Sequence, residues 1–175
     1  DVDGIVFDDY FYPNGGMTDA KDQAQYDAYN PDSLERGDWR RHQVNLMVKD
    51  VHDAIKARKP WVRFGISPAG VACTNRSVAE SYGITPCPSS SDWQYNGIYA
   101  DPLAWYNEHT IDYMAPQVYW KIGSSSDYDQ LTRWWSDMAA HFGRHMYVSQ
   151  SLSAMVKDDV TISSSSSSSF HASEI

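Results

Sequence analysis

Three segments of this sequence share one plan, in which a short apolar run ends abruptly in polar and aromatic side chains. Residues 3–13 are Asp-Gly-Ile-Val-Phe-Asp-Asp-Tyr-Phe-Tyr-Pro, residues 61–68 end in Ser-Pro, and residues 111–120 end in Gln-Val-Tyr-Trp. Such apolar runs are typical of parallel strands that are buried on both faces. In α/β enzymes the site lies at the carboxyl ends of those strands. The three segments therefore predict an α/β fold with a site at that edge of the sheet.

Helical segments alternate with these strands. Between the first two strands we expect a small helix over 19–29 and a long helix that Asp38 caps and that ends before Lys59-Pro60. The long helix has an apolar stripe formed by Val44, Met47, Val48, Val51 and Ile55. Its amphipathic pattern places it against the sheet.

The second half of the chain continues the alternation. Residues 68–100 are rich in Ser, Pro and Gly, which predicts a long loop. A short helix follows from Asp101-Pro102 to Glu108, then a helix over about 127–142 and a fourth strand over 146–149. The expected core face of the helix over 127–142 is Leu131, Trp134, Trp135 and Met138. The order of strands and helices indicates parallel βα units.

Composition limits the function classes. The chain has 175 residues, enough for one domain with a real core, and a net charge of −9 that argues against a nucleic-acid partner. Its apolar runs are too short for a transmembrane segment. Seven Trp and twelve Tyr are many for the length. These rings either fill the core or line a groove in which they stack on sugars.

Metals and cofactors have no recognisable motif here. No CxxC or HExxH pattern, phosphate-binding glycine loop or metal-ligand spacing of the six His is present, so we expect no metal and no cofactor. The two cysteines, Cys73 and Cys87, form either a local disulfide or two free thiols. Residues 163–169 are seven consecutive serines. We therefore divide the chain into a domain over 1–162 and a Ser-rich tail over 163–175, which is either a linker or a poorly assigned stretch of sequence.

Five motifs together resemble the glycosyl-hydrolase-like family 10 domain of bacterial secreted proteins and lipoproteins. They come in the order of the family and cover roughly residues 1–150. The motifs are Asp3-Gly-Ile-Val-Phe-Asp-Asp-Tyr-Phe-Tyr-Pro13, Trp39-Arg-Arg with Val44-Asn45, Phe64-Gly-Ile-Ser-Pro68, Asp101-Pro-Leu103, and Ile111-Asp-Tyr-Met-Ala-Pro-Gln-Val-Tyr-Trp120.

The resemblance implies a fold and a function. The family is similar to TIM barrels that cleave sugars, and some members act on peptidoglycan glycan strands. It implies a glycoside hydrolase outside the cytoplasm, at the periplasm or cell surface of a bacterium, where a lipid anchor is one way of holding it. This chain then corresponds to strands four to eight of a (β/α)₈ barrel, which takes about 250 residues. The partner of its open sheet edge is either an amino-terminal half-barrel or a second copy in a homodimer.

Strand parity sorts the carboxylates of the expected site. In the second strand Phe64 and Ile66 should pack outward against the helices. By the same parity Asp8 shares the inward face of its strand with Gly4 and Val6, so it is the first catalytic candidate. Asp9 reaches the same site only if the strand bends at its end, and is the partner carboxylate. Asp3 and Asp112 precede their strands, where polar residues usually serve stability. Glycoside hydrolysis needs a second carboxyl group, which we expect from missing strands or from Asp19, Asp22, Asp92 or Asp101.

Other side chains near the expected site are candidates for substrate binding. By strand parity Gln117 and Tyr119 face inward on the third strand, and Ser67 faces inward on the second. Gln117 suits a sugar hydroxyl, and Tyr119 and Trp120 suit ring stacking. Arg40 can pair with Asp9 or hold an anionic sugar substituent, and Asn45 follows it on the helix. The loop aromatics that extend a groove are Tyr10, Tyr12, Trp93, Tyr95 and Tyr99. Packing or a solvated helix turn explains each of these residues equally well. The alternative to a hydrolase is a carbohydrate-binding or scaffolding module on the same barrel.

Overall fold

A computed structural model describes residues 2–151 of the chain, so the predicted boundary at residue 162 and the serine run lie outside the described residues. The strands are β1 (Gly4–Phe7), β2 (Arg63–Ile66), β3 (Tyr113–Met114) and β4 (His145–Met146). The helices are α1 (Asp19–Ala28), α2 (Arg36–Arg58), α3 (Arg76–Ser81), α4 (Pro102–Asn107) and α5 (Tyr128–Phe142), with a π-helical turn η1 at Trp93–Gly97. The alternation of strands and helices is as predicted.

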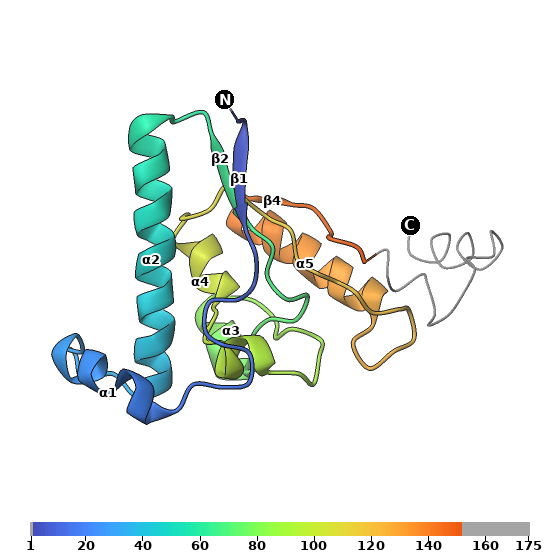
Figure 1. Cartoon of the computed structure of the whole chain (residues 1–175). Coiled ribbons are helices and arrows are strands. Elements are labelled where there is room, and N and C mark those ends of the chain that lie inside the picture. The colour runs from blue at the N-terminus through green and yellow to red at the C-terminus, as the bar shows by residue number, and fades with distance from the viewer. Residues whose placement is uncertain (1, 152–175) are drawn as a thin grey trace, which may run out of the picture.

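The four strands form one parallel sheet in the order β1-β2-β3-β4, with Gly4 opposite Arg63 and Tyr113 opposite His145. Every strand thus neighbours the next one in the chain, the arrangement that successive βα units produce. Helices α2, α4 and α5 lie in a row, α4 contacting both of the others (Figure 1). The fold is mixed α/β with a parallel sheet, and it is compatible with part of a TIM barrel.

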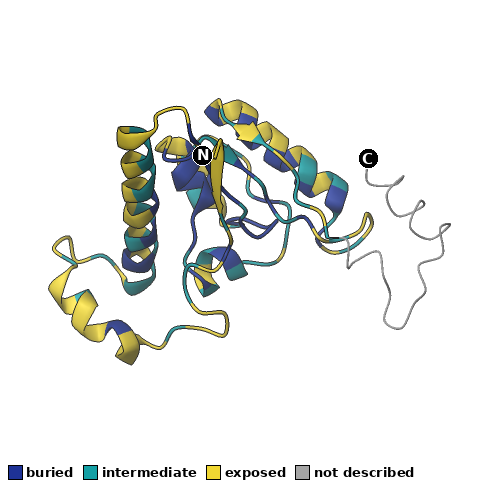
Figure 2. Ribbon diagram, turned by 45° about the horizontal axis from the view of Figure 1, so that its top comes forward, coloured by how far each residue is buried: buried dark blue, intermediate teal, exposed yellow. Residues whose placement is uncertain are grey.

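The two faces of the sheet differ in burial. Phe64 and Ile66 are fully buried on the helical side, in the same apolar cluster as Val44 and Val48 of α2. Strand parity predicts this orientation for both β2 residues. On the opposite face Val6 is 54% exposed, and Figure 2 shows β1 coloured as exposed over most of its length. The helices therefore cover one face of the sheet only.

Helix ends follow local sequence rules in most places. Asp127 caps α5 by accepting from the amide of Gln130 at 3.0 Å, and Gly143 ends this helix in a left-handed conformation with φ 65°. Asp101 caps α4, and its Oδ1 accepts from the amide of Ala104 at 3.3 Å. Both helices begin where the sequence predicts. The core face of α5 is also confirmed, since Leu131, Trp134, Trp135 and Met138 are buried.

The predicted start of α2 is wrong by a few residues. The helix begins at Arg36 with Glu35 as its N-cap, and Asp38 lies in the first turn, where it pairs with Arg41 at 2.6 Å. An acidic residue fits the helix dipole at either position, so the sequence does not discriminate between them. Within the predicted stripe Val44 and Val48 are buried, whereas Met47 is 37% exposed.

Two other predictions need correction. Residues 68–100 contain α3 and η1, so this segment is not a loop throughout. The third strand is shorter than predicted, because Pro116 has no N–H to continue the ladder. Beyond β3, Gln117 forms isolated parallel bridges with Ala69 and Ser149. The chain at 111–120 thus runs alongside its neighbours without forming one continuous strand, and β4 likewise ends at Met146.

Large aromatic side chains fill much of the core. Trp105, Trp135 and Tyr106 are fully buried, and Tyr106 stacks on Phe142 with ring centroids 5.8 Å apart. For these rings packing is the role that the structure displays. Among residues 2–151, no helix is long and apolar enough to cross a membrane.

Candidate functional site

The polar residues that follow β1, β2 and β3 gather at the carboxyl edge of the sheet. β1 ends at Phe7 and the chain bends at Asp9, so both Asp8 and Asp9 leave the strict alternation of the strand. The bend is the condition under which the sequence places Asp9 in the site. Asp9 is 6% exposed, whereas Asp8 is exposed.

The two neighbouring carboxyl groups have different environments. The pKa of Asp9 is raised above its usual value of 3.8, first because burial disfavours the charged form and then through a hydrogen bond with Asp8 and repulsion by its charge. The amide of Asp9 donates to Oδ1 of Asp8 at 2.9 Å. A buried carboxyl beside a solvated carboxylate tends to keep its proton, which is the property that general acid catalysis requires.

Gln117 connects the ends of all three strands. Its Nε2 donates to Oδ1 of Asp8 at 2.7 Å and to the carbonyl of Ser67 at 2.9 Å. The hydroxyl of Ser67 in turn donates to the carbonyl of Ala115 at 2.8 Å. Asp8, Ser67 and Gln117 were all predicted to share the inward face, and the structure brings them together. The amide of Gln117 fixes the orientation of the Asp8 carboxylate.

A cavity of about 180 Å³ opens at this edge and contains Asp9 in its lining. The other members of the lining are Ala69, Gly70, Val71, Trp93, Gln117, Tyr119 and Trp120. A Cβ on Gly70 would lie 2.8 Å from the ring of Trp120 and closer still to the carbonyl oxygen of Gln117. The chain can pass this close only because residue 70 is glycine. Sequence reasoning missed Gly70, and the signal available was a glycine in the loop a few residues beyond the end of β2.

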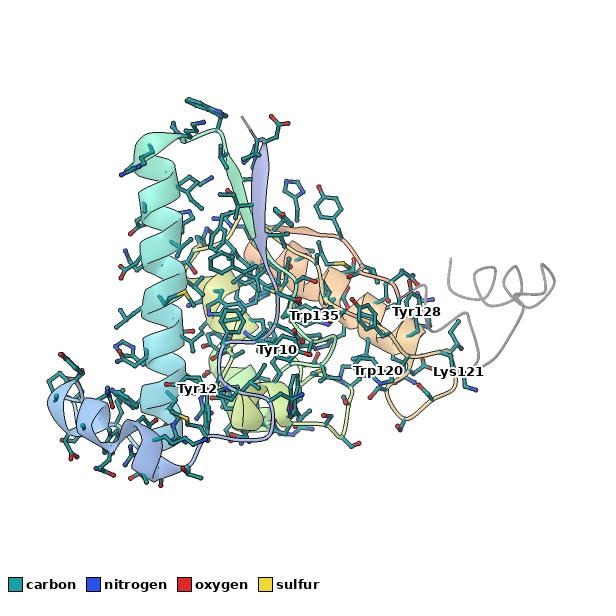
Figure 3. All side chains as sticks on the ribbon, in the orientation of Figure 1. Tyr10, Tyr12, Trp120, Lys121, Tyr128 and Trp135 are labelled. Atoms are coloured by element: carbon teal, nitrogen blue, oxygen red, sulfur yellow. The ribbon has the colours of Figure 1, made fainter. Side chains whose placement is uncertain are left out.

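Aromatic rings border the carboxylates on several sides. Tyr119 is 41% exposed, and its hydroxyl lies 3.3 Å from Oγ of Ser149. Tyr10 is 66% exposed, and with Asp8 it lines a second hollow of about 320 Å³. Figure 3 shows Tyr10, Tyr12 and Trp120 on loops beyond the strand ends, on one side of the molecule. The arrangement offers flat apolar surfaces next to hydrogen-bonding groups.

Arg40 lies away from the carboxylate pair. Its guanidinium is 2% exposed and donates through Nε to Oδ2 of Asp22 at 2.7 Å and through Nη1 to the hydroxyl of Tyr99 at 2.8 Å. The hydrogen bond from Arg40 lowers the pKa of Asp22 below its usual value. Of the roles that the sequence leaves open for Arg40, pairing with Asp9 is not formed in this structure, because the loop after β1 folds back through α1 and supplies Asp22 as the counter-ion. Arg40 holds α1 and Tyr99 against α2. The ring of Tyr12 packs against that of Tyr99, with ring centroids 5.2 Å apart.

The neighbours of Arg40 on α2 also support the loops. Arg41 stacks on the ring of Tyr95 at 3.9 Å and donates to the carbonyl of Tyr95 at 2.9 Å. Asn45 accepts from Nε1 of Trp105 at 2.8 Å, which joins α2 to α4. Arg41 thereby anchors η1, the turn that carries Trp93 of the cavity lining. In this structure Asn45 contacts the core rather than the cavity.

The loop carboxylates considered as second catalytic groups have other partners. Asp19 and Asp22 pair with Arg40, Asp92 lies 3.4 Å from the hydroxyl of Thr74, and Asp101 caps α4. Asp112 at the opposite edge accepts from Lys56 at 2.7 Å and from the amide of Phe64 at 2.8 Å, a contact set that stabilises the sheet. Within residues 2–151, no cluster of three or more His, Cys, Asp or Glu could hold a metal ion.

Comparison with known proteins identifies the family of this chain. A family model described as glycosyl hydrolase-like 10 matches residues 1–163. The chain belongs to the glycosyl hydrolase-like 10 family. It is 41% identical over 158 residues to the glycosyl hydrolase YngK of Bacillus subtilis, an alignment that covers 86% of this chain and 29% of that protein. The family and the name of this relative point to a glycoside hydrolase-like function.

A second relative gives the same result. The glycosyl hydrolase DigH of Escherichia coli strain K12 is 36% identical over 152 residues, which is 84% of this chain and 33% of that protein. DigH of Shigella flexneri matches equally well. The chain thus spans about a third of the length of these curated relatives.

Proposed function

We propose that the protein containing this chain is a glycoside hydrolase that acts on a polysaccharide outside the cytoplasm, with Asp9 as the proton donor and Asp8 as its partner carboxylate. The observation that carries this proposal is a buried Asp9 with a raised pKa in a cavity lined by aromatic rings at the strand ends. Cleavage of a glycosidic bond needs a carboxylic acid that keeps its proton until it protonates the leaving oxygen. Burial and the charge of Asp8 both favour that state.

The surroundings suit a sugar chain. Trp93, Trp120 and Tyr119 offer ring faces for the apolar side of a pyranose, and Tyr10 extends this surface beyond the cavity. Gln117 and Ser67 supply hydrogen-bonding groups beside them. Among polysaccharides we propose peptidoglycan glycan strands as the substrate, and the periplasm or the cell surface as the location, where a lipid anchor is one way of holding the protein.

One observation favours a different function, a carbohydrate-binding or scaffolding module without catalysis. Asp8 and Asp9 are adjacent and hydrogen-bonded to each other. The two carboxyl groups of glycosidases are instead about 5–5.5 Å apart in retaining enzymes and roughly 6.5–9.5 Å apart in inverting ones. If no carboxyl group from another part of the protein completes the pair, the cavity binds sugar and does not cleave it.

The two functions are separated by an assay of the full-length protein on a glycan panel that includes peptide-stripped peptidoglycan. Mass spectrometry counts new chain ends for the wild type, Asp9→Asn, Asp8→Asn and the distant control Asp112→Asn. A hydrolase gives cleavage that Asp9→Asn abolishes and Asp112→Asn retains. Retention of glycan without any new chain end selects the binding module.

We also propose that the sheet is part of a (β/α)₈ barrel completed by an amino-terminal half-barrel of the longer protein. The support is an apolar groove of about 510 Å³ between β1 and α2, lined mainly by Val2, Ile5, Phe7, Val51 and Ile55. Parallel sheets are usually covered on both faces, yet Val6 at the open edge strand is 54% exposed. A preceding strand and helix would pair with β1 and fill this groove.

Light scattering of the chain alone, and co-expressed with the preceding segment of its own protein, tests the barrel. The proposal expects a one-to-one complex that Ile5→Asp disrupts, because a carboxylate would then lie in the apolar groove. The control Ile122→Asp changes an exposed loop residue far from the groove. A homodimer that excludes the preceding segment would contradict the proposal.

A further inference from the structure

The two cysteines come together beneath the candidate site. The amide of Cys87 donates to the carbonyl of Cys73 at 3.3 Å, and the amide of Ala72 donates to Sγ of Cys87 at 3.4 Å. Both thiols are buried, with 1% and 3% of the residue exposed. In this structure they are free. The sequence alone left a disulfide and two free thiols equally open.

The backbone contact sets the separation of the two residues. Antiparallel residues that exchange two backbone hydrogen bonds have Cα atoms about 5.5 Å apart, and the single bond from Cys87 to Cys73 likewise brings the two backbones into direct contact. A disulfide needs Cα atoms about 4.4–6.8 Å apart. The segments are therefore already positioned for a bridge, and rotation of the two side chains about their Cα–Cβ bonds is the movement that remains.

We propose that Cys73 and Cys87 form an intramolecular disulfide when the protein folds in an oxidising compartment. The oxidant is a low-molecular-weight disulfide such as oxidised glutathione. One cysteine thiolate attacks it to give a mixed disulfide and release one glutathione thiolate, and the second cysteine then displaces the other. One S–S bond forms in the protein and one breaks in the oxidant, and the two protons from the cysteines end on two glutathione thiols.

The timing of the reaction follows from burial. Desolvation raises the pKa of Cys73 to about 11 and that of Cys87 to about 12, the latter with repulsion from Cys73 as a smaller cause. Thiolates, not thiols, carry out the exchange. The folded, reduced protein should therefore oxidise slowly, and the bridge should form before residues 73 and 87 are buried.

The bridge would act on the floor of the cavity. Ala69, Gly70 and Val71 line the cavity immediately before Cys73, and the carbonyl of Gly70 accepts from Nε1 of Trp135 at 2.9 Å. The ring closed by the bridge contains α3. A covalent link at Cys73 would thus restrict the movement of residues 69–71, which line the cavity. The inference is independent of any catalytic role for Asp9.

Peptide mapping of the wild-type protein tests the proposal. Trypsin cleaves after Arg63, Arg76 and Lys121, so the cysteines fall on two different peptides, 64–76 and 77–121. The full-length protein is refolded with oxidised and reduced glutathione, denatured with an alkylating agent and digested without reductant. We expect the two peptides to be linked to each other, and to separate after reduction. Two separately alkylated peptides, or cysteines linked between chains, would overturn the proposal.

Stability supplies a second readout that does not depend on mapping. A disulfide that closes a loop of this length should raise the midpoint of thermal unfolding. The midpoint of the oxidised protein should be roughly 5–10 °C above the midpoint measured for the same protein in the presence of reductant. The double variant Cys73→Ala/Cys87→Ala is the control, because reductant should not change its midpoint. If reductant leaves the wild-type midpoint unchanged as well, no bridge is present. Disulfide formation by diamide in the folded, reduced protein should be much slower than disulfide formation by oxidised glutathione during refolding.

Discussion

The side-chain amide of Gln117 donates to Oδ1 of Asp8 at 2.7 Å, although the two residues follow different strands and are 109 positions apart in the chain. This contact, with the one to the carbonyl of Ser67, holds the exposed carboxylate beside the buried Asp9. The candidate site therefore depends on a residue that carries no charge and cannot transfer a proton.

Replacement of Gln117 tests this support. Gln117→Leu keeps the volume and removes both hydrogen bonds, so Asp8 loses its fixed orientation and the cleavage rate should fall roughly 10–100-fold. The midpoint of urea unfolding should change little, because the amide is near solvent. Gln25→Leu on the exposed surface of α1 is the matched control and should leave the rate unchanged. A wild-type rate for Gln117→Leu would exclude it as a positioning residue.

Gly70→Ala should close the cavity. The new Cβ would overlap the ring of Trp120 and the carbonyl of Gln117, and backbone cannot move aside cheaply. We expect loss of glycan binding, measured by calorimetry, and a loss of about 1–3 kcal/mol in the free energy of unfolding. Gly65→Ala is the control. Its Cβ would meet the ring of Tyr113 rather than the cavity lining, so it should lower stability while glycan binding survives.

Asp9→Asn should change stability in a pH-dependent way. The folded pKa of Asp9 is raised, so the protonated form contributes stability that is complete below about pH 3.8 and is lost as the pH rises through the folded pKa. Asn mimics the protonated carboxyl at every pH. Above that range the variant should be more stable than the wild type, by about 1.4 kcal/mol for each unit of pKa shift, and the difference should vanish in acid. Thermal unfolding from pH 3 to 8 measures it.

Asp112→Asn should change stability at neutral pH in the opposite direction from Asp9→Asn. Burial by itself raises the pKa of Asp112, but the hydrogen bonds from Lys56 and the amide of Phe64 outweigh it and lower the folded pKa below 3.8. The ionised form stabilises the fold above 3.8, and this contribution is lost as the pH falls through the folded pKa. The variant should therefore be less stable than the wild type at neutral pH. Equal pH profiles for the two variants would contradict both assignments.

Arg40→Ala should lower the free energy of unfolding by about 2–3 kcal/mol, because it removes the buried guanidinium that donates twice to Asp22 and leaves Arg36 as the remaining cation beside that carboxylate. The loop that carries Tyr12 should also lose protection in hydrogen exchange. Arg133→Ala removes an exposed ion pair with Asp129 on α5 and should leave the free energy of unfolding almost unchanged, because solvent screens such a pair. Similar losses for both variants would mean that Arg40 acts as a surface residue.

The sequence predicts the elements well because their signals are local. Asp127 and Asp101 begin helices through their own side chains, and parity along β2 places Phe64 and Ile66 on the helical face. The inward group of Asp8, Ser67 and Gln117 follows from the same parity. The partners of Arg40 could not be predicted, because they depend on how the loop after β1 folds back to present Asp22. That Asp9 rather than Asp8 is buried could not be predicted either, because it depends on a bend that lies beyond the strand.

The most direct test of the account is the pH dependence of kcat/KM for cleavage by the full-length protein, measured beside a ¹³C NMR titration of the Asp9 carboxyl. A proton donor must be protonated, so the account predicts that activity falls on the alkaline side with the same midpoint as the Asp9 titration. Asp9→Asn should abolish cleavage, while its thermal midpoint stays at or above the wild-type value. An Asp9→Asn variant that cleaves at the wild-type rate with an unchanged pH profile would contradict the account.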